Sequence, residues 1–190
     1  MKILGIDPGY GITGFGLIDA QRGQFRLLNC GAITTPPNTE FSWRLEVIYN
    51  DMVQLLQVAQ PDVVAIEELF FGQNVTTGIN VAQSRGVILL AIRQAGLPVF
   101  EYKPMQVKQA VVGYGNATKP QVQDKTKRLL HLSAMPGLPH PFWLRQMQNA
   151  ECRMQNEHGN PSHHIPMHNS ICPLRNWEII ILHFAFCILH

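Results

Sequence analysis

The order of apolar runs and helical repeats restricts this chain to a sheet of mixed direction with helices packed on it. Three apolar runs follow one another near the amino terminus, and the later runs are separated by segments with apolar residues every three or four positions. Strands joined by tight turns pair antiparallel, whereas strands separated by a helix run parallel. The expected strands cover residues 2–7, 13–20, 25–34, 62–67 and 98–102, and the expected helices cover residues 42–60, 75–95, 104–112 and 119–131. This order predicts an α/β fold.

Residue usage changes abruptly at Pro136. Residues 1–136 contain all five Asp and all six Lys, whereas residues 137–190 contain seven of the eight His and no Asp or Lys. The second part also shows no sustained period and is interrupted by several prolines, which break regular structure. We therefore interpret residues 1–136 as the folded domain and residues 137–190 as an aberrant tail of the kind that a frameshift produces.

Several classes of protein are excluded by simple features of the chain. No basic amino-terminal region leads into a long apolar stretch, so secretion and membrane binding are not expected. We expect a cytoplasmic protein. The four cysteines lie far apart without a Cys-x-x-Cys motif, which argues against a disulfide framework. The formal net charge is only +2, so binding to nucleic acid would require a local basic patch.

Two acidic residues stand where buried strands are expected to end. Asp7 follows the first apolar run and Glu67 ends the fourth. If these strands are parallel neighbours, the two carboxylates lie side by side, where they would raise each other's pKa and could bind Mg²⁺ or Mn²⁺. Strand-end acids are also common turn formers, and the residues alone weight the two interpretations about equally.

A glycine-rich segment, residues 7–16, joins the first two expected strands. Such a loop allows a phosphate to approach the backbone closely, although hairpins also need glycine. The segment is typical of polynucleotidyl transferases with a ribonuclease-H-like fold and of actin-like kinases and ATPases. The second class is disfavoured, because no Asp-x-Gly-Gly segment follows Pro98.

Basic and aromatic residues follow the acids along the chain. Lys108 and Lys119 lie on the last two expected helices, with Tyr114 between them. They are either solvated helix faces or part of a surface that binds phosphates. Phe70, with Phe71 beside it, follows Glu67 directly and is either a core residue or a residue that stacks on a base.

Taken together, these segments resemble the RuvC family of bacterial Holliday junction resolvases. The resemblance runs almost continuously over residues 2–136, and the block QVKQAVVGYGNATKPQVQ is specific to that family. The segments that carry it are ILGIDPGYGITGFGLI, PDVVAIEELFFGQN, SRGVILLAIRQAGLPVFEYKPMQVKQAVVGYGNATKPQV and RLLHLSAMP.

The resemblance implies a ribonuclease-H-like mixed β-sheet flanked by helices, in a homodimer that cuts four-way DNA junctions during recombination and repair. It also implies two Mg²⁺ ions per active site, with Mn²⁺ as a substitute, and a branch-migration helicase complex as a partner. Asp7 and Glu67 match the first two catalytic, metal-binding carboxylates of the family. Phe70 matches an aromatic residue that stacks at the junction, and Lys108 and Lys119 match basic residues near the scissile phosphates.

The chain departs from the family after Pro136. The family continues there with Asp-x-x-Asp-Ala, which supplies two more acidic ligands, whereas this chain contains no Asp after Asp124. His140 lies near the expected position, but a lone histidine between two prolines is a poor ligand candidate. An alternative function is therefore a catalytically impaired protein that binds four-way junctions.

Overall fold

A computed structural model describes residues 1–69 and 75–134 of this chain. Every strand and helix expected within these residues is present. The predicted stacking residue Phe70, its neighbour Phe71, His140 and the tail of residues 137–190 lie outside the described residues. The elements are β1 (Lys2–Asp7), β2 (Ile12–Gln21), β3 (Gln24–Thr34), α1 (Phe41–Ala59), β4 (Val63–Glu67), α2 (Val75–Gln94), β5 (Val99–Tyr102), α3 (Pro104–Val112) and α4 (Lys119–Leu129).

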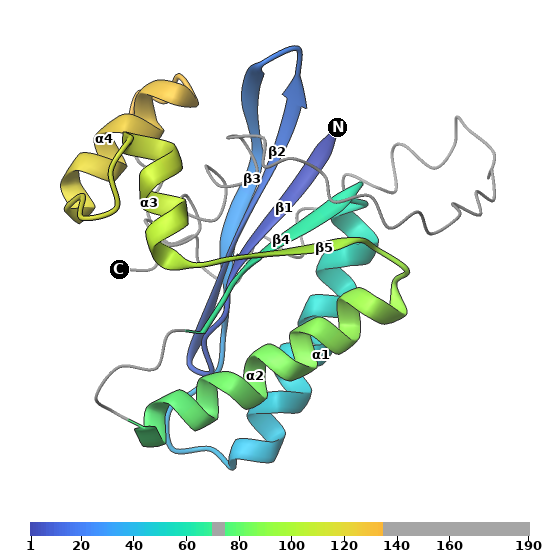
Figure 1. Ribbon diagram of the computed structural model, residues 1–190. Coiled ribbons are helices and arrows are strands. Elements are labelled where there is room, and N and C mark those ends of the chain that lie inside the picture. Colours follow the sequence, from blue (N-terminus) through green and yellow to red (C-terminus); the bar gives the residue numbers. More distant parts are fainter. Residues whose placement is uncertain (70–74, 135–190) are drawn as a thin grey trace, which may run out of the picture.

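The sheet has five strands in the order β3-β2-β1-β4-β5 (Figure 1). β1, β2 and β3 form an antiparallel meander, and β4 pairs in parallel with both β1 and β5. Both pairing directions follow from the connections, because turns join the first three strands and helices separate the later ones. The predicted mixed sheet is confirmed.

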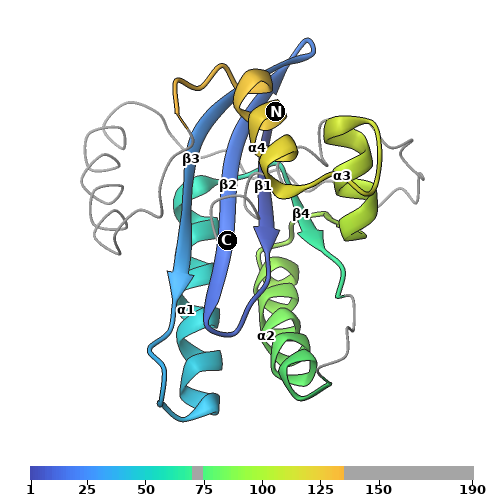
Figure 2. The same ribbon diagram turned by 90° about the vertical axis from the view of Figure 1, so that its left-hand side faces the viewer.

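One face of the sheet is covered by α1 and α2 (Figure 2). Successive side chains of a strand point to opposite faces, so every second residue of β1 and β4 contributes to this core. The buried residues of the cluster are Leu4, Ile6, Phe15, Leu17, Ile33, Ile48, Met52, Leu55, Leu56, Ala59, Val64, Ile66, Ile88, Ala91 and Ile92.

The opposite face is covered by α3 and α4 (Figure 2). Val107 of α3 packs with Ala65 of β4 and Tyr102 of β5. Leu130, which follows α4, packs with Ile3 and Ile18. α3 therefore lies over β4 and β5, and the end of α4 reaches β1 and β2.

The fourth helix is shorter than its sequence pattern predicts. We expected helix to residue 131, but α4 ends at Leu129. His131 has a φ of 52°, in the left-handed region that a continuous α-helix does not visit. Within the described ranges, none of the helices combines the length and the hydropathy that crossing a bilayer would require.

Candidate active site

Asp7 and Glu67 end two strands that pair directly and run in the same direction. The register pairs Ile6 of β1 with Ile66 of β4, and each acid is the next residue of its strand. Ile6 and Ile66 belong to the core beneath α1 and α2, so the alternation of the strands places both acids on the other face, which α3 covers. The structure thus brings the two predicted site residues together.

The two carboxyl groups are hard to ionise in this position. Burial raises the pKa of Asp7 to about 7. Burial is also the main cause that raises the pKa of Glu67 to about 8, and the negative charge of Asp7 adds to the effect. The expected direction of both shifts is confirmed. The expected cause, repulsion between the two acids, contributes only to the rise for Glu67, where it is smaller than the effect of burial.

Lys108 of α3 is the third predicted residue near this site. Its positive charge opposes the other two effects and lowers the pKa of Glu67. The influence is possible because α3 packs over the same face of β4, with Val107 in contact with Ala65. A carboxylate pair with an ammonium group beside it is suited to a divalent cation and the phosphate that it binds.

Arg85 of α2 supports the site in a way that the sequence did not reveal. Its Nε donates a hydrogen bond of 3.0 Å to the backbone carbonyl of Glu67, and its guanidinium forms an ion pair with Glu101 of β5. The bond joins residues 18 positions apart, so no local pattern could have indicated it. It fixes the end of β4 where Glu67 leaves the sheet.

The turn after Asp7 is tight and rich in short contacts. Thr13 Oγ1 donates a hydrogen bond of 2.6 Å to the carbonyl of Gly9. A Cβ at Gly9 would collide with the carbonyl oxygen of Ile12, so only glycine fits there. A cavity of about 480 Å³ borders this turn, and Asp7 and Arg44 are among the residues that line it.

Comparison with known proteins identifies the family. The family model described as "Crossover junction endodeoxyribonuclease RuvC" matches residues 3–141. The chain belongs to the RuvC family. Among curated RuvC proteins, that of Heliobacterium modesticaldum is 53% identical over 136 residues, which are 72% of this chain and 84% of the relative. That of Brevibacillus brevis is 51% identical over 136 residues, which are 72% of this chain and 82% of the relative.

Solved structures of RuvC proteins confirm the ribonuclease-H-like fold. Thermus thermophilus RuvC in complex with a Holliday junction substrate is 31% identical, with a TM-score of 0.66, and the match covers 82% of this chain and 96% of that one. The yeast mitochondrial Holliday junction resolvase Ydc2 is 9% identical with a TM-score of 0.53, and the match covers 98% of this chain and 75% of that one. The second likeness concerns the fold alone.

The other residues that the sequence singled out do not cluster with Asp7 and Glu67 in the described part of the chain. Lys119 begins α4, and it is not among the groups that shift the pKa of Glu67. Tyr114, which lies between α3 and α4 in the sequence, is 43% exposed. Phe70 lies outside the described residues, and its predicted stacking role stays a prediction.

The oxygen donors of Asp7 and Glu67 fit a divalent cation. Two desolvated carboxylates side by side are unfavourable as free anions, and a bound cation would relieve both the burial and the repulsion. Residues 1–69 and 75–134 contain no group of three or more His, Cys, Asp or Glu that could hold a metal ion. Asp7 and Glu67 thus form a pair of possible oxygen ligands within the described part of the chain.

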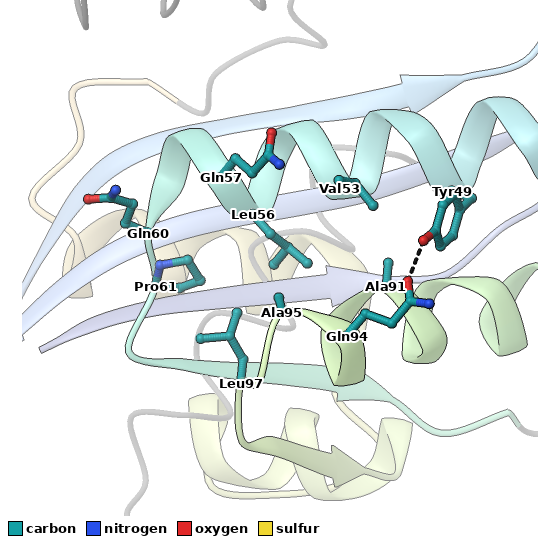
Figure 3. A pocket seen from close by; sticks show the side chains of 10 residues that line it. All are labelled: Tyr49, Val53, Leu56, Gln57, Gln60, Pro61, Ala91, Gln94, Ala95 and Leu97. Atoms are coloured by element: carbon teal, nitrogen blue, oxygen red, sulfur yellow. Dashed lines mark hydrogen bonds between the residues drawn. The ribbon is translucent and has the colours of Figure 1, made fainter. Parts of the chain in front are cut away.

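A larger hollow lies away from the acids. It measures about 570 Å³ and lies between α1 and α2, where Tyr49 donates a hydrogen bond to Gln94 (Figure 3). Its wall combines aliphatic and glutamine side chains, and none of the candidate site residues lines it.

Proposed function

We propose that this chain is a crossover junction endodeoxyribonuclease, which binds four-way DNA junctions and hydrolyses phosphodiester bonds with the help of divalent metal ions. The observation that carries the proposal is the pair of partly buried carboxylates, Asp7 and Glu67, at the ends of adjacent parallel strands in a fold of the RuvC family. Such a pair is costly unless it binds a cation.

Asp7 and Glu67 would hold Mg²⁺, or Mn²⁺ in its place, with two ions per site as the family resemblance implies. When bound, such ions supply an activated water and stabilise the charge that develops on the leaving 3′ oxygen. Both carboxyl groups have raised pKa values, about 7 for Asp7 and about 8 for Glu67, so both must lose a proton before they can bind metal. Lys108, on the same face, would contact the phosphate.

DNA binding would use residues beyond the metal ligands. Lys108 and Lys119 stand on α3 and α4, the two helices that cover the face with the acids. Ammonium groups on such a surface bind phosphates and make affinity depend on salt. Phe70 would stack on a base at the junction, as the family resemblance implies.

A homodimer would use the exposed side of α2. Ile79 and Leu90 are each 50% exposed, which is unusual for large apolar side chains on one helix. They are separated by three helical turns and therefore share a face with Gly86, where a Cβ would meet no atom within 4 Å. An apolar stripe with a glycine at its centre suits close packing against the same helix of a second copy.

The wider setting of the reaction follows from the proposed substrate. Four-way junctions arise in chromosomal DNA, which in bacteria lies in the cytoplasm, and we place the activity there. A branch-migration helicase complex would be a partner on the same junction, as the family resemblance implies.

The second candidate function is junction binding with strongly impaired cleavage. It is favoured by the small donor set of the described residues and by the lack of any Asp after Asp124. In this case the fold and the basic surface would still recognise the junction, while the second metal ion would be held poorly.

One experiment separates the two candidates. Labelled synthetic four-way junctions and matched linear duplexes are incubated with the full chain in Mg²⁺ and in Mn²⁺, and binding is measured separately in EDTA. Metal-dependent nicking of the junction that Glu67→Gln abolishes supports the nuclease. Tight junction binding without nicking supports the impaired protein. Equal affinity for junction and duplex contradicts both.

A further inference from the structure

The turn that follows Asp7 is held from outside by the residue after β3. The backbone N–H of Thr35 donates to the carbonyl of Gly11 at 3.0 Å, and its Oγ1 donates to the carbonyl of Tyr10 at 2.7 Å. Thr35 is only 6% exposed, so these bonds are protected from competition with water. One threonine thus satisfies two consecutive carbonyls of the turn.

Arg44, in the first turns of α1, completes this arrangement. Its Nε donates to Thr35 Oγ1 at 2.8 Å, and its Cζ lies 4.7 Å from the centre of the Tyr10 ring. The same ring meets Phe41 edge to face, with 6.1 Å between the ring centres. The guanidinium also lies close against the turn at Gly11, where an added Cβ would stand 3.2 Å from Nη2. Arg44 therefore contacts the turn directly through the Tyr10 ring and indirectly through its hydrogen bond to Thr35.

We propose that Arg44 is a positioning residue that, through Thr35 and Tyr10, fixes the turn after Asp7 and so holds the Asp7 carboxylate ready to bind metal. The inference rests on the proposed function only in taking Asp7 as a metal ligand. Residues behind the ligands of a metal commonly orient them, and their loss typically lowers metal affinity by about 10- to 100-fold.

The shape of the Arg44 side chain matters more in this role than its charge. Within residues 1–69 and 75–134, the ion pairs join other groups and Arg44 takes part in none of them. A lysine would keep the positive charge, but it has neither a donor at the Nε position nor a planar group to stack on Tyr10. Arginine and lysine should therefore differ sharply here.

A direct contact between Arg44 and a DNA phosphate is the competing role. Arg44 and Asp7 line the same cavity of about 480 Å³, and the Nη atoms could reach a phosphate placed there. That role depends on charge, so a lysine would largely preserve it and a methionine would remove it. The two roles therefore predict opposite behaviour for the lysine variant.

The test uses four variants of the full chain, Arg44→Lys, Arg44→Met, Thr35→Val and Thr35→Ser. Thr35→Val removes the hydroxyl group at constant shape, and Thr35→Ser keeps it. Circular dichroism identifies a temperature at which all of them are folded. Mn²⁺ affinity is then measured by electron paramagnetic resonance, and amide hydrogen exchange is followed at residues 9–12. Asp7→Asn shows how much of the Mn²⁺ binding belongs to Asp7.

We expect Arg44→Lys, Arg44→Met and Thr35→Val each to lower Mn²⁺ affinity about 10-fold and to speed exchange in the turn, while Thr35→Ser stays near the wild type. Arg44→Lys with wild-type affinity and exchange would overturn the inference. So would a salt dependence of junction binding that falls in Arg44→Met and is restored in Arg44→Lys, because it would show a phosphate contact. Mn²⁺ affinity unchanged by Asp7→Asn would contradict the proposed metal site instead, and exchange in the turn would still decide the role of Arg44.

Discussion

Asp7 and Glu67 occupy equivalent positions on two neighbouring parallel strands, one residue beyond the paired Ile6 and Ile66. The shared direction brings both carboxyl groups to one edge of the sheet, and the shared register turns them to one face. Burial raises the pKa of both, and their proximity adds to the rise for Glu67. The pair is thus unfavourable in the absence of a cation, which supports the proposal that it binds one.

Removal of one buried charge should stabilise the metal-free protein. The pKa of Asp7 is about 7 in the folded chain and 3.8 for the free group, so the folded state holds the proton more tightly. The free energy of unfolding therefore decreases as pH rises from about 4 to about 7. We expect Asp7→Asn to raise it by about 2 kcal/mol at pH 8, measured by urea denaturation in EDTA.

The control for this variant is Asp124→Asn. Asp124 is exposed and pairs with Arg128 at 2.9 Å on the surface of α4, where such pairs contribute little. Its replacement should change stability by less than about 0.5 kcal/mol at any pH. At pH 4 the advantage of Asp7→Asn should largely disappear, because Asp7 is then neutral in the folded state and about half protonated in the unfolded state.

Metal binding should depend steeply on pH. Asp7 and Glu67 ionise near 7 and 8, and only the ionised forms bind a cation. We expect the logarithm of Mn²⁺ affinity to fall with a slope of about 2 as pH drops below 7, and with a slope of about 1 in Glu67→Gln. Titration calorimetry in several buffers would measure both the slope and the protons released. A Mn²⁺ affinity that does not change between pH 6 and pH 9 would contradict the assignment of Asp7 and Glu67 as metal ligands.

Junction binding should lose salt dependence when the basic residues are removed. Lys108→Ala and Lys119→Ala should each weaken binding and reduce the slope of log affinity against log salt by about 1, as expected for one lost phosphate contact. Lys2→Ala is the matched control, because Lys2 starts β1 at the opposite end of the strand from Asp7. Slopes that match the wild type for both test variants would mean that these lysines are only solvated helix faces.

Cleavage should be slow when compared with a relative. The RuvC protein of Brevibacillus brevis is 51% identical over 136 residues and provides a reference on the same labelled junction. The RuvC resemblance implies two further acidic ligands after Pro136, and this chain has no Asp after Asp124 to supply them. Loss of one group that stabilises the transition state typically costs about 10²–10³ in rate. We therefore expect nicking by this chain to be slower by at least about 10² in Mg²⁺ and in Mn²⁺. Equal rates would require a further ligand from outside the described residues.

The exposed stripe on α2 should control self-association. Leu90→Glu places a charge in the proposed interface between two copies, where it would be desolvated without a partner. We expect sedimentation equilibrium to show a dimer for the wild type and a monomer for this variant. Met105→Glu is the control, because Met105 is 65% exposed on α3 and lies outside the stripe. A wild-type monomer would remove the proposed interface.

Much of the fold could be read from local patterns. The alternation and length of the apolar runs predicted the strands of the described sheet and the directions of the first four, because pairing direction depends on whether a turn or a helix connects two strands. The end of α4 was predicted two residues too late, since the helical pattern continues beyond Leu129 while His131 adopts a left-handed conformation. Backbone conformation at one residue leaves no mark in the spacing of apolar side chains.

The sequence by itself determined which residues end the strands and which family the chain resembles, since both depend on residues that are close along the chain. Only the tertiary structure decided that Asp7 and Glu67 share a face with Lys108 nearby and that burial dominates their pKa values. It also decided that Arg85 bonds to the carbonyl of Glu67 and Arg44 to Thr35. These properties arise from contacts between distant segments. Desolvation in particular depends on every element packed around a carboxyl group, and no single stretch of sequence contains that information.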